Sequence, residues 1–374
     1  MTNTSIERSG KPATSGRNHA LDGLRAIAAV TIVLFHLGLT GLVAIALGGG
    51  HQISSFMHGL GSSGVELFFT LSAVVLLKPY LTKQRRMAVW PYLKRRLNRL
   101  WPPFLGAWLL AGATVAVVAA YPTWWPSAMP AFDWGTWASQ AFIFYAGNSA
   151  YNFAWWTLTI EVLFYVLAPL LVLVLAGRSE RTMAIVLVAS IVLSQGATLI
   201  PAGSPLLGLA ERFLVFASCF VGGMLLATYK LSTSTRWAIC GAGALFIAGN
   251  AIDARVDGHV GFGLLYMAIV SSAMQDRSFL NVALSRQLPV WLGERSYSLF
   301  LTHYSVIALA CWSTSLLIHD KGAAYFVVSR TIAIVGALLV SCALFELVES
   351  RFAHGLSTVG EWWPGRRRSA VDAA

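Results

Sequence analysis

The chain has 374 residues, of which 56% are hydrophobic and only 11% are charged. An ordinary soluble domain carries about 25% charged residues, so this composition excludes a soluble globular protein and indicates a polytopic membrane protein. The formal net charge of +11 does not indicate nucleic-acid binding, because the basic residues follow the topological pattern described below.

Three regions follow from the distribution of polar residues. Residues 1–20 are polar and rich in Ser, Thr and Gly, and they predict a disordered cytosolic tail. Residues 21–352 are the predicted transmembrane domain, and 353–374 are a basic cytosolic tail. No cleavable signal peptide is apparent, so the first span is expected to direct insertion. The cysteines lie in apolar runs without metal-ligand spacing, so we expect buried thiols and no metal site.

The apolar segments predict an all-α fold. A helix needs about 20 apolar residues to cross the bilayer. About ten segments satisfy this requirement: 25–47, 63–81, 101–120, 153–176, 182–200, 210–229, 236–252, 260–275, 291–317 and 324–348. A shorter apolar piece at 137–147 predicts a re-entrant or interfacial helix.

The basic residues predict the orientation. Lys and Arg are concentrated in cytosolic loops of membrane proteins. Loop 78–100 is dense in both, whereas loops 48–62 and 121–152 contain neither. The same alternation of basic and non-basic loops continues along the chain. Three basic residues fall on the side expected to be external: Arg212, Arg255 and Lys321. This pattern predicts that both termini are cytosolic.

The first candidate site is the stretch Leu21–His36, LDGLRAIAAVTIVLFH. On one helix Arg25 and His36 would be roughly 16 Å apart along the axis, with Arg25 at a membrane surface and His36 near the bilayer centre. A titratable side chain at that depth is a candidate functional group. The alternative is a histidine satisfied by a neighbouring helix.

Two further titratable residues are expected at a similar depth. Glu161 in WWTLTIEVLFY and His303 in SYSLFLTHY lie roughly 12 and 18 Å inside their spans. Each needs a polar partner in the membrane, and each could supply one to the others. A purely structural polar network is the alternative.

A dense basic segment, KRRLNRLWPPF, begins the third span. Helical spacing brings Arg95, Arg96 and Arg99 toward one face, and guanidinium groups bind phosphate in bidentate fashion. Simple anchoring by the positive-inside rule is the alternative, but the density of the cluster favours a phosphate site.

The external segment 121–156 is rich in aromatic residues. Most of them fit an interfacial belt, whereas Trp155 and Trp156 are candidates for a surface on which a sugar ring stacks. In the second span Glu66 is a candidate substrate-binding residue. Ser72 has no identifiable general base beside it, and a hydroxyl bonded to its own backbone is the commoner case.

Taken together, these motifs resemble the membrane-bound acyltransferase 3 family of bacterial sugar O-acyltransferases. The similarity is carried by six motifs in order: LDGLRAIAAVTIVLFH, GVELFFTLS, RLNR, WTLTIEVLFY, SYSLFLTHY and FELVESRF. Ala73 and Ser305 depart from the family pattern, where glycine and proline are usual. No fused soluble esterase-like domain is expected.

The resemblance implies transfer of an acyl group, commonly acetyl, from cytosolic acyl-CoA to a hydroxyl of a carbohydrate or small-molecule acceptor at the bacterial cytoplasmic (inner) membrane. The CoA phosphates would be held by arginines of the motifs: Arg25, Arg96 and Arg99, with Arg95 beside them. His36 would be the general base, or would carry the acyl group transiently. Glu161 would orient an imidazole, with His303 as a supporting residue.

Two other functions are compatible with the same residues. A proton-coupled transporter also uses buried His, Glu and Arg, but it predicts similar halves, which the sequence does not show. A scaffold in an envelope-polymer export complex predicts that loss of His36 or Arg25 is tolerated. The sequence does not define an oligomeric state.

Overall fold

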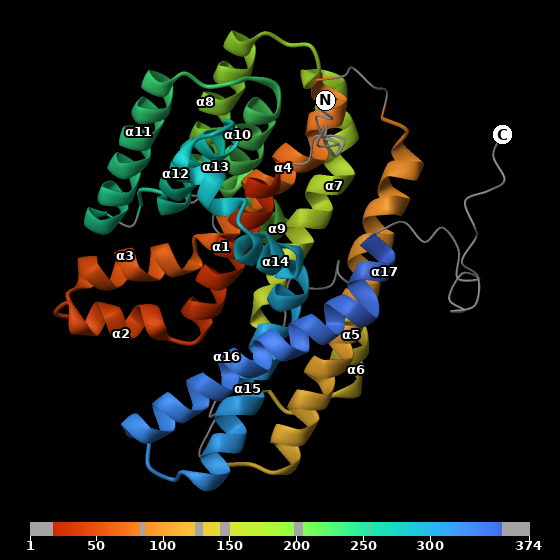
Figure 1. The fold of residues 1–374 in the computed structure, drawn as a ribbon, viewed down its shortest axis with the longest axis vertical. Helices are drawn as coiled ribbons and strands as arrows, with labels where there is room; N and C mark the ends of the chain where they lie inside the picture. The colour runs from red at the N-terminus through yellow and green to blue at the C-terminus, as the bar shows by residue number, and fades with distance from the viewer. Residues whose placement is uncertain are drawn as a thin grey trace, which may run out of the picture.

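The computed structural model describes residues 18–82, 87–123, 130–142, 150–197, 205–253 and 255–353. Within these ranges every regular element is a helix, which confirms the all-α prediction for this part of the chain (Figure 1). Nearly all of the two expected tails, and the end of the expected short helix at 137–147, lie outside the described residues.

The described residues form a succession of helices. Their bounds are α1 His19–His36, α2 Leu39–Ala46, α3 His51–Ser62, α4 Gly64–Thr82, α5 Val89–Ala120, α6 Trp134–Ser139, η2 Phe153–Trp155, α7 Trp156–Leu175, α8 Glu180–Ala197, α9 Pro205–Val215, α10 Ala217–Thr228, α11 Thr233–Ile252, α12 Gly258–Ala273, α13 Phe279–Leu284, α14 Gln287–Glu294, α15 Ser296–Leu317, α16 Ala323–Leu344, η3 Phe345–Glu349 and α17 Ser350–Ala353. The element η2 is a 3₁₀ turn and η3 is a π-helix.

Helix α1 is bounded by a defined cap at each end. The side chain of Asn18 accepts a hydrogen bond from the Ala20 amide at 3.0 Å. After His36 the chain turns through Gly38, whose φ of 75° is a left-handed conformation that glycine adopts at little cost. The single span predicted over 25–47 is therefore wrong, because this turn ends α1 and starts α2 in a new direction.

Helix α1 occupies the centre of the fold and packs against α3, α4, α13, α14 and α15 (Figure 1). Glycines allow its backbone to approach its neighbours closely. A Cβ added at Gly64 of α4 would lie 2.4 Å from the Ala28 carbonyl oxygen, and one at Gly293 of α14 would lie 1.8 Å from that of Asp22. Small residues at such crossings are typical of membrane helix packing.

Seven helical stretches in the described residues are long and apolar enough to cross a membrane, and the bent pair Leu207–Val215 and Ala217–Thr228 could supply an eighth. The number differs from the ten predicted. The segments predicted at 236–252 and 260–275 do form helices, α11 and α12, but neither is among these seven. Helix α12, with 16 residues, is about 24 Å long, which is less than the bilayer core.

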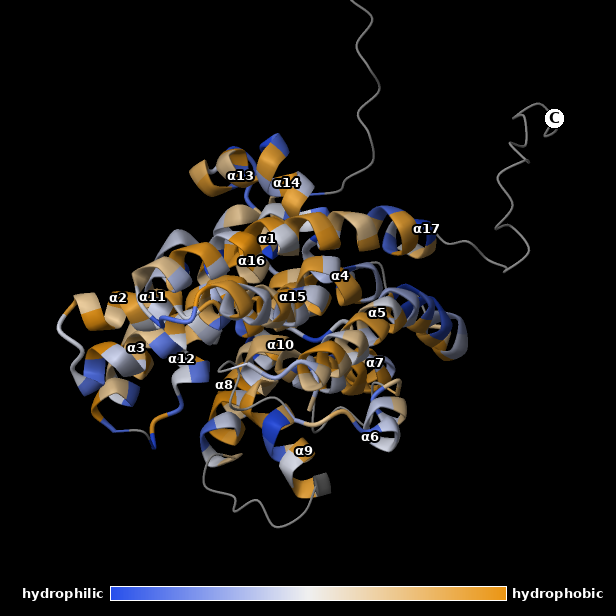
Figure 2. Ribbon diagram, turned by 90° about the horizontal axis from the view of Figure 1, so that it is seen from below, coloured by the Kyte–Doolittle hydropathy of each residue, from blue (hydrophilic) through white to orange (hydrophobic). Residues whose placement is uncertain are grey.

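Large apolar side chains cover the outer surfaces of the bundle. Leu173 is 80% exposed, Val192 is 65% exposed and Leu339 is 66% exposed, although each belongs to a long regular helix. Figure 2 shows hydrophobic residues along most of the helices. Such exposure suits contact with lipid rather than with water, and it supports a multi-pass membrane protein.

Close packing of α10 on α4 gives a stability prediction. A Cβ at Gly223 would lie 2.4 Å from the Thr70 carbonyl oxygen, so Gly223→Ala forces two backbones apart. We expect it to lower the free energy of unfolding by about 1–3 kcal/mol and to lower the melting temperature in detergent. Gly241→Ala on α11 is the matched control, because nothing lies within 4 Å of its Cβ position. Equal melting temperatures for both variants would contradict this description of the helix crossing.

Candidate functional site

Two histidines from distant parts of the chain are in direct contact. His36 at the end of α1 and His303 in the middle of α15 have their Nδ1 and Nε2 atoms 3.1 Å apart. His303 is fully buried, and its Nδ1 atom lies 2.8 Å from the Phe300 carbonyl oxygen. The two residues were expected at a similar depth, and their side chains are in contact.

The hydrogen bonds of the pair assign its tautomers. A carbonyl oxygen can only accept, so His303 carries its hydrogen on Nδ1 and its Nε2 atom accepts from His36. The Nδ1 atom of His36 also lies 3.0 Å from the Ile32 carbonyl oxygen and therefore carries the hydrogen. The Nε2 atom of His36 is left with a free lone pair, as a proton acceptor requires.

His36 lines a cavity of about 1050 Å³. Its walls come from α1, α3, α4, α6, η2, α7, α9, α12 and α15, and they combine titratable and aromatic side chains. The lining includes several aromatic rings, among them Trp156 and Tyr304, and five imidazole or charged side chains: His36, His58, Glu211, Arg212 and His259. A cavity of this size and composition is suited to a small organic ligand.

At the opposite end of α1 three arginines form a second feature, which we call the arginine cluster: Arg25, Arg96 and Arg99. Each is partly buried. Arg25 lies 3.5 Å from Asp22, and it also interacts electrostatically with Arg99. Guanidinium groups that are close together and partly buried repel one another. A bound polyanion would relieve this repulsion, so the cluster is well suited to bind one.

Glu161 lies beside the arginine cluster and not beside the histidine pair. Its Oε1 atom accepts hydrogen bonds from Ser72 at 3.1 Å and from the Tyr165 hydroxyl. It also interacts electrostatically with Arg25. This placement differs from the expectation that Glu161 orients an imidazole. Tyr165, which sequence reasoning missed, is buried between this carboxylate and Arg96.

The C-terminal acidic motif also reaches the arginine cluster. Glu349, in the π-helix η3, is 2% exposed and accepts hydrogen bonds from the Ser298 amide and hydroxyl at 3.1 and 2.6 Å. It interacts electrostatically with Arg99 and Arg25. Because Ser298 lies on α15, this contact connects the cluster to the helix that carries His303. π-Helical segments are frequent at functional sites.

Two predicted residues lie away from both features. Arg95 is exposed, and a hydrogen bond of 3.4 Å joins it to the Tyr80 hydroxyl. Trp155 is fully buried, with its indole nitrogen 3.1 Å from the Leu301 carbonyl oxygen, so it packs in the core. Its neighbour Trp156 lines the cavity, because consecutive helical residues face different directions.

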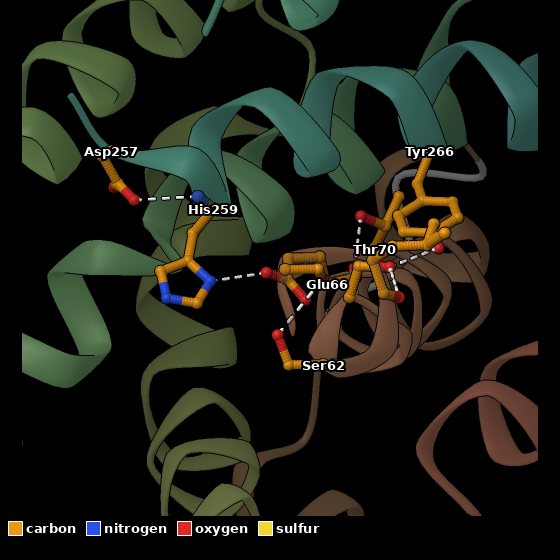
Figure 3. Close-up of polar contacts among 9 residues, drawn as sticks. Ser62, Glu66, Thr70, Asp257, His259 and Tyr266 are labelled. Atoms are coloured by element: carbon orange, nitrogen blue, oxygen red, sulfur yellow. Dashed lines mark hydrogen bonds and ion pairs between the residues drawn. The ribbon is translucent and has the colours of Figure 1, made fainter. Parts of the chain in front are cut away.

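Glu66 is buried on α4 and is paired with a residue that sequence reasoning missed. Its Oε1 atom lies 2.5 Å from the Nδ1 atom of His259, and Glu66 is 1% exposed (Figure 3). Glu66 itself does not line the cavity, whereas His259 does. The sequence around Glu66 contains nothing that identifies His259 as its partner, because the two residues are 193 positions apart.

Arg330 on α16 fixes the end of α1. Its Nε atom donates to the Leu37 carbonyl oxygen at 3.1 Å, directly after His36. A second nitrogen lies 3.0 Å from the Ser329 hydroxyl, and the guanidinium lies 4.4 Å from the Phe326 ring centroid. A cation at a helix C-terminus is favourable, and this one compensates for placing a charge in an apolar helix.

Arg330→Met should therefore destabilise the protein, since it leaves the Leu37 carbonyl without its charged donor. Hydrogen bonds to charged groups contribute about 1.5–3 kcal/mol, so we expect a clear loss of melting temperature in detergent. Arg330→Lys keeps a charge and one donor and should lose less. If both variants melt like the wild type, Arg330 does not hold the end of α1.

Comparison with known proteins agrees with the motifs that form these two features. No curated protein and no solved structure matches the chain at the threshold applied. A family model described as an acyltransferase domain, Acyl_transf_3, matches residues 18–346, which include the histidine pair, the cavity and Arg25, Arg96 and Arg99. The chain therefore belongs to the acyltransferase 3 family.

Proposed function

We propose that the protein transfers an acyl group, acetyl in the simplest case, from cytosolic acyl-CoA to a hydroxyl of a carbohydrate acceptor in the cavity. The observation that carries this proposal is the layout of α1. One end of this helix bears Arg25 of the arginine cluster, and the other bears His36 on the cavity wall.

The arginine cluster is the proposed site for the CoA phosphates. Its members lie at the end of the bundle where the basic loops are found, which the positive-inside rule assigns to the cytosol. Arg25 and His36 are separated by about 16 Å along α1, so the thioester has to travel inward from the phosphates. The extended pantetheine arm of CoA suits this geometry.

His36 is the proposed general base. Its free Nε2 atom would take the proton of the acceptor hydroxyl while the hydroxyl oxygen attacks the thioester carbon and the CoA thiolate leaves. His303 holds the His36 ring through Nδ1 and so keeps Nε2 available. General base catalysis of this kind accelerates reactions about 10²–10⁴-fold.

The donor site is tested with binding of acetyl-CoA to purified protein in detergent. Arg25→Ala and Arg99→Ala each remove charged hydrogen bonds to phosphate, so we expect the dissociation constant to rise about 10–100-fold. Arg95→Ala is the matched control, since Arg95 lies outside the cluster and should change binding far less. Unchanged affinity in the Arg25 and Arg99 variants would place the phosphates elsewhere.

His36→Ala tests the chemistry. We expect the variant to bind acetyl-CoA with near-normal affinity and to lose at least about 100-fold in CoA-thiol release in the presence of acceptor. An acid-quenched sample analysed by mass spectrometry separates the two mechanisms, because an acyl-histidine would add the acyl mass to the peptide that contains His36. Full turnover by His36→Ala would exclude both general base catalysis by His36 and an acyl-histidine intermediate at this residue.

A further inference from the structure

We propose that His259, oriented by Glu66, anchors the acceptor in the cavity and determines which of its hydroxyl groups reaches His36. The inference rests on the proposed function and deepens it, because it assigns a specificity-determining residue to the acceptor side. Figure 3 shows the residues that carry it.

The charge of the pair follows from burial. Glu66 is 1% exposed and its Oε2 atom has no hydrogen-bond partner among the described residues, so its carboxylate depends on the contact of 2.5 Å with His259. Asp257, 3% exposed, accepts a hydrogen bond from the His259 amide at 2.9 Å and interacts electrostatically with the same imidazole. Two buried acids beside one imidazole favour a protonated ring, because an uncompensated buried carboxylate is costly.

The free edge of the imidazole faces the cavity. Its Nδ1 atom is engaged by Glu66, and the second ring nitrogen points away from that carboxylate in Figure 3. The side chain is 43% exposed and lines the cavity, and the Phe216 ring, with its centroid 4.8 Å away, packs against it. A protonated His259 therefore presents an N–H donor to a ligand.

Two of the three histidines that line the cavity, His36 and His259, thus have opposite roles, and His58 is the third. His36 offers a lone pair at Nε2, whereas His259 offers a donor at Nε2. The wall of the same cavity includes Trp156 and Phe216, whose ring centroids are 5.8 Å apart. A pyranose fits this arrangement, because it has apolar faces for aromatic rings and several oxygens for polar groups. A second oxygen held by His259 fixes the orientation of the ring and hence the hydroxyl that His36 can deprotonate.

The test uses acetyl-CoA and a set of methyl glycopyranosides (gluco, galacto and manno) as probes. For each variant we would measure the half-saturating concentration of the methyl glycoside and locate the acetyl group in the product by NMR. His259→Gln and Glu66→Gln are the test variants. His51→Gln is the matched control, because His51 is an exposed histidine of α3 that does not line the cavity.

We expect His259→Gln and Glu66→Gln to raise the half-saturating glycoside concentration about tenfold or more and to spread acetylation over several hydroxyls. His51→Gln should match the wild type in both respects. Retained acetyl-CoA affinity shows that the variants are folded, so a general loss of structure cannot produce the expected pattern.

An unchanged half-saturating concentration and a single unchanged product position in both test variants would overturn the role of His259. A wild type that binds acetyl-CoA but acetylates none of the probes would also overturn it, while leaving the donor site intact. Absence of acetyl-CoA binding by the wild type is a different result, which contradicts the proposed function itself.

Discussion

The cost of burying charged and polar groups inside an apolar helical bundle is the constraint on which the rest of the structure depends. Several such groups are tied to a partner from another helix: His303 holds His36, Ser72 holds Glu161, and Ser298 holds Glu349. Glu161 also accepts a hydrogen bond from Tyr165 of its own helix. These contacts connect α15 to α1 and to η3, and they connect α4 to α7. The His36 lone pair and the arginine cluster are the groups that we propose to bind substrate.

This constraint also explains why α1 ends where it does. A continuous helix over 25–47 would bury His36 in the middle of a span. Gly38 and the Arg330 contact to Leu37 instead end the helix at His36, and the imidazole ring lies on the wall of the cavity. The backbone break, the arginine and the histidine together form one structural unit, although Arg330 comes from the opposite end of the chain.

The sequence predicted a shared depth for His36 and His303, and these two residues are in contact, but it did not identify the partners of the other buried polar groups. Depth along a helix follows from residue counting, and His36 and His303 are indeed in contact. The direction in which a side chain points depends on helix rotation, which counting does not supply. Trp155 and Trp156 are adjacent, yet one packs in the core and the other lines the cavity. Glu161 was expected at the level of the two histidines, but it lies beside the arginines instead. The contacts of Glu66 with His259 and of Arg330 with Leu37 depend on tertiary packing, so no local sequence pattern predicts them.

The most direct test of the central claim is an experimental structure of the protein with a non-hydrolysable acetyl-CoA analogue. We expect density for the CoA phosphates against Arg25, Arg96 and Arg99, and the thioester position within reach of the His36 Nε2 atom. Phosphates bound at any other surface, or an acyl end that is directed away from His36, would contradict the proposal that α1 connects the donor to the acceptor cavity.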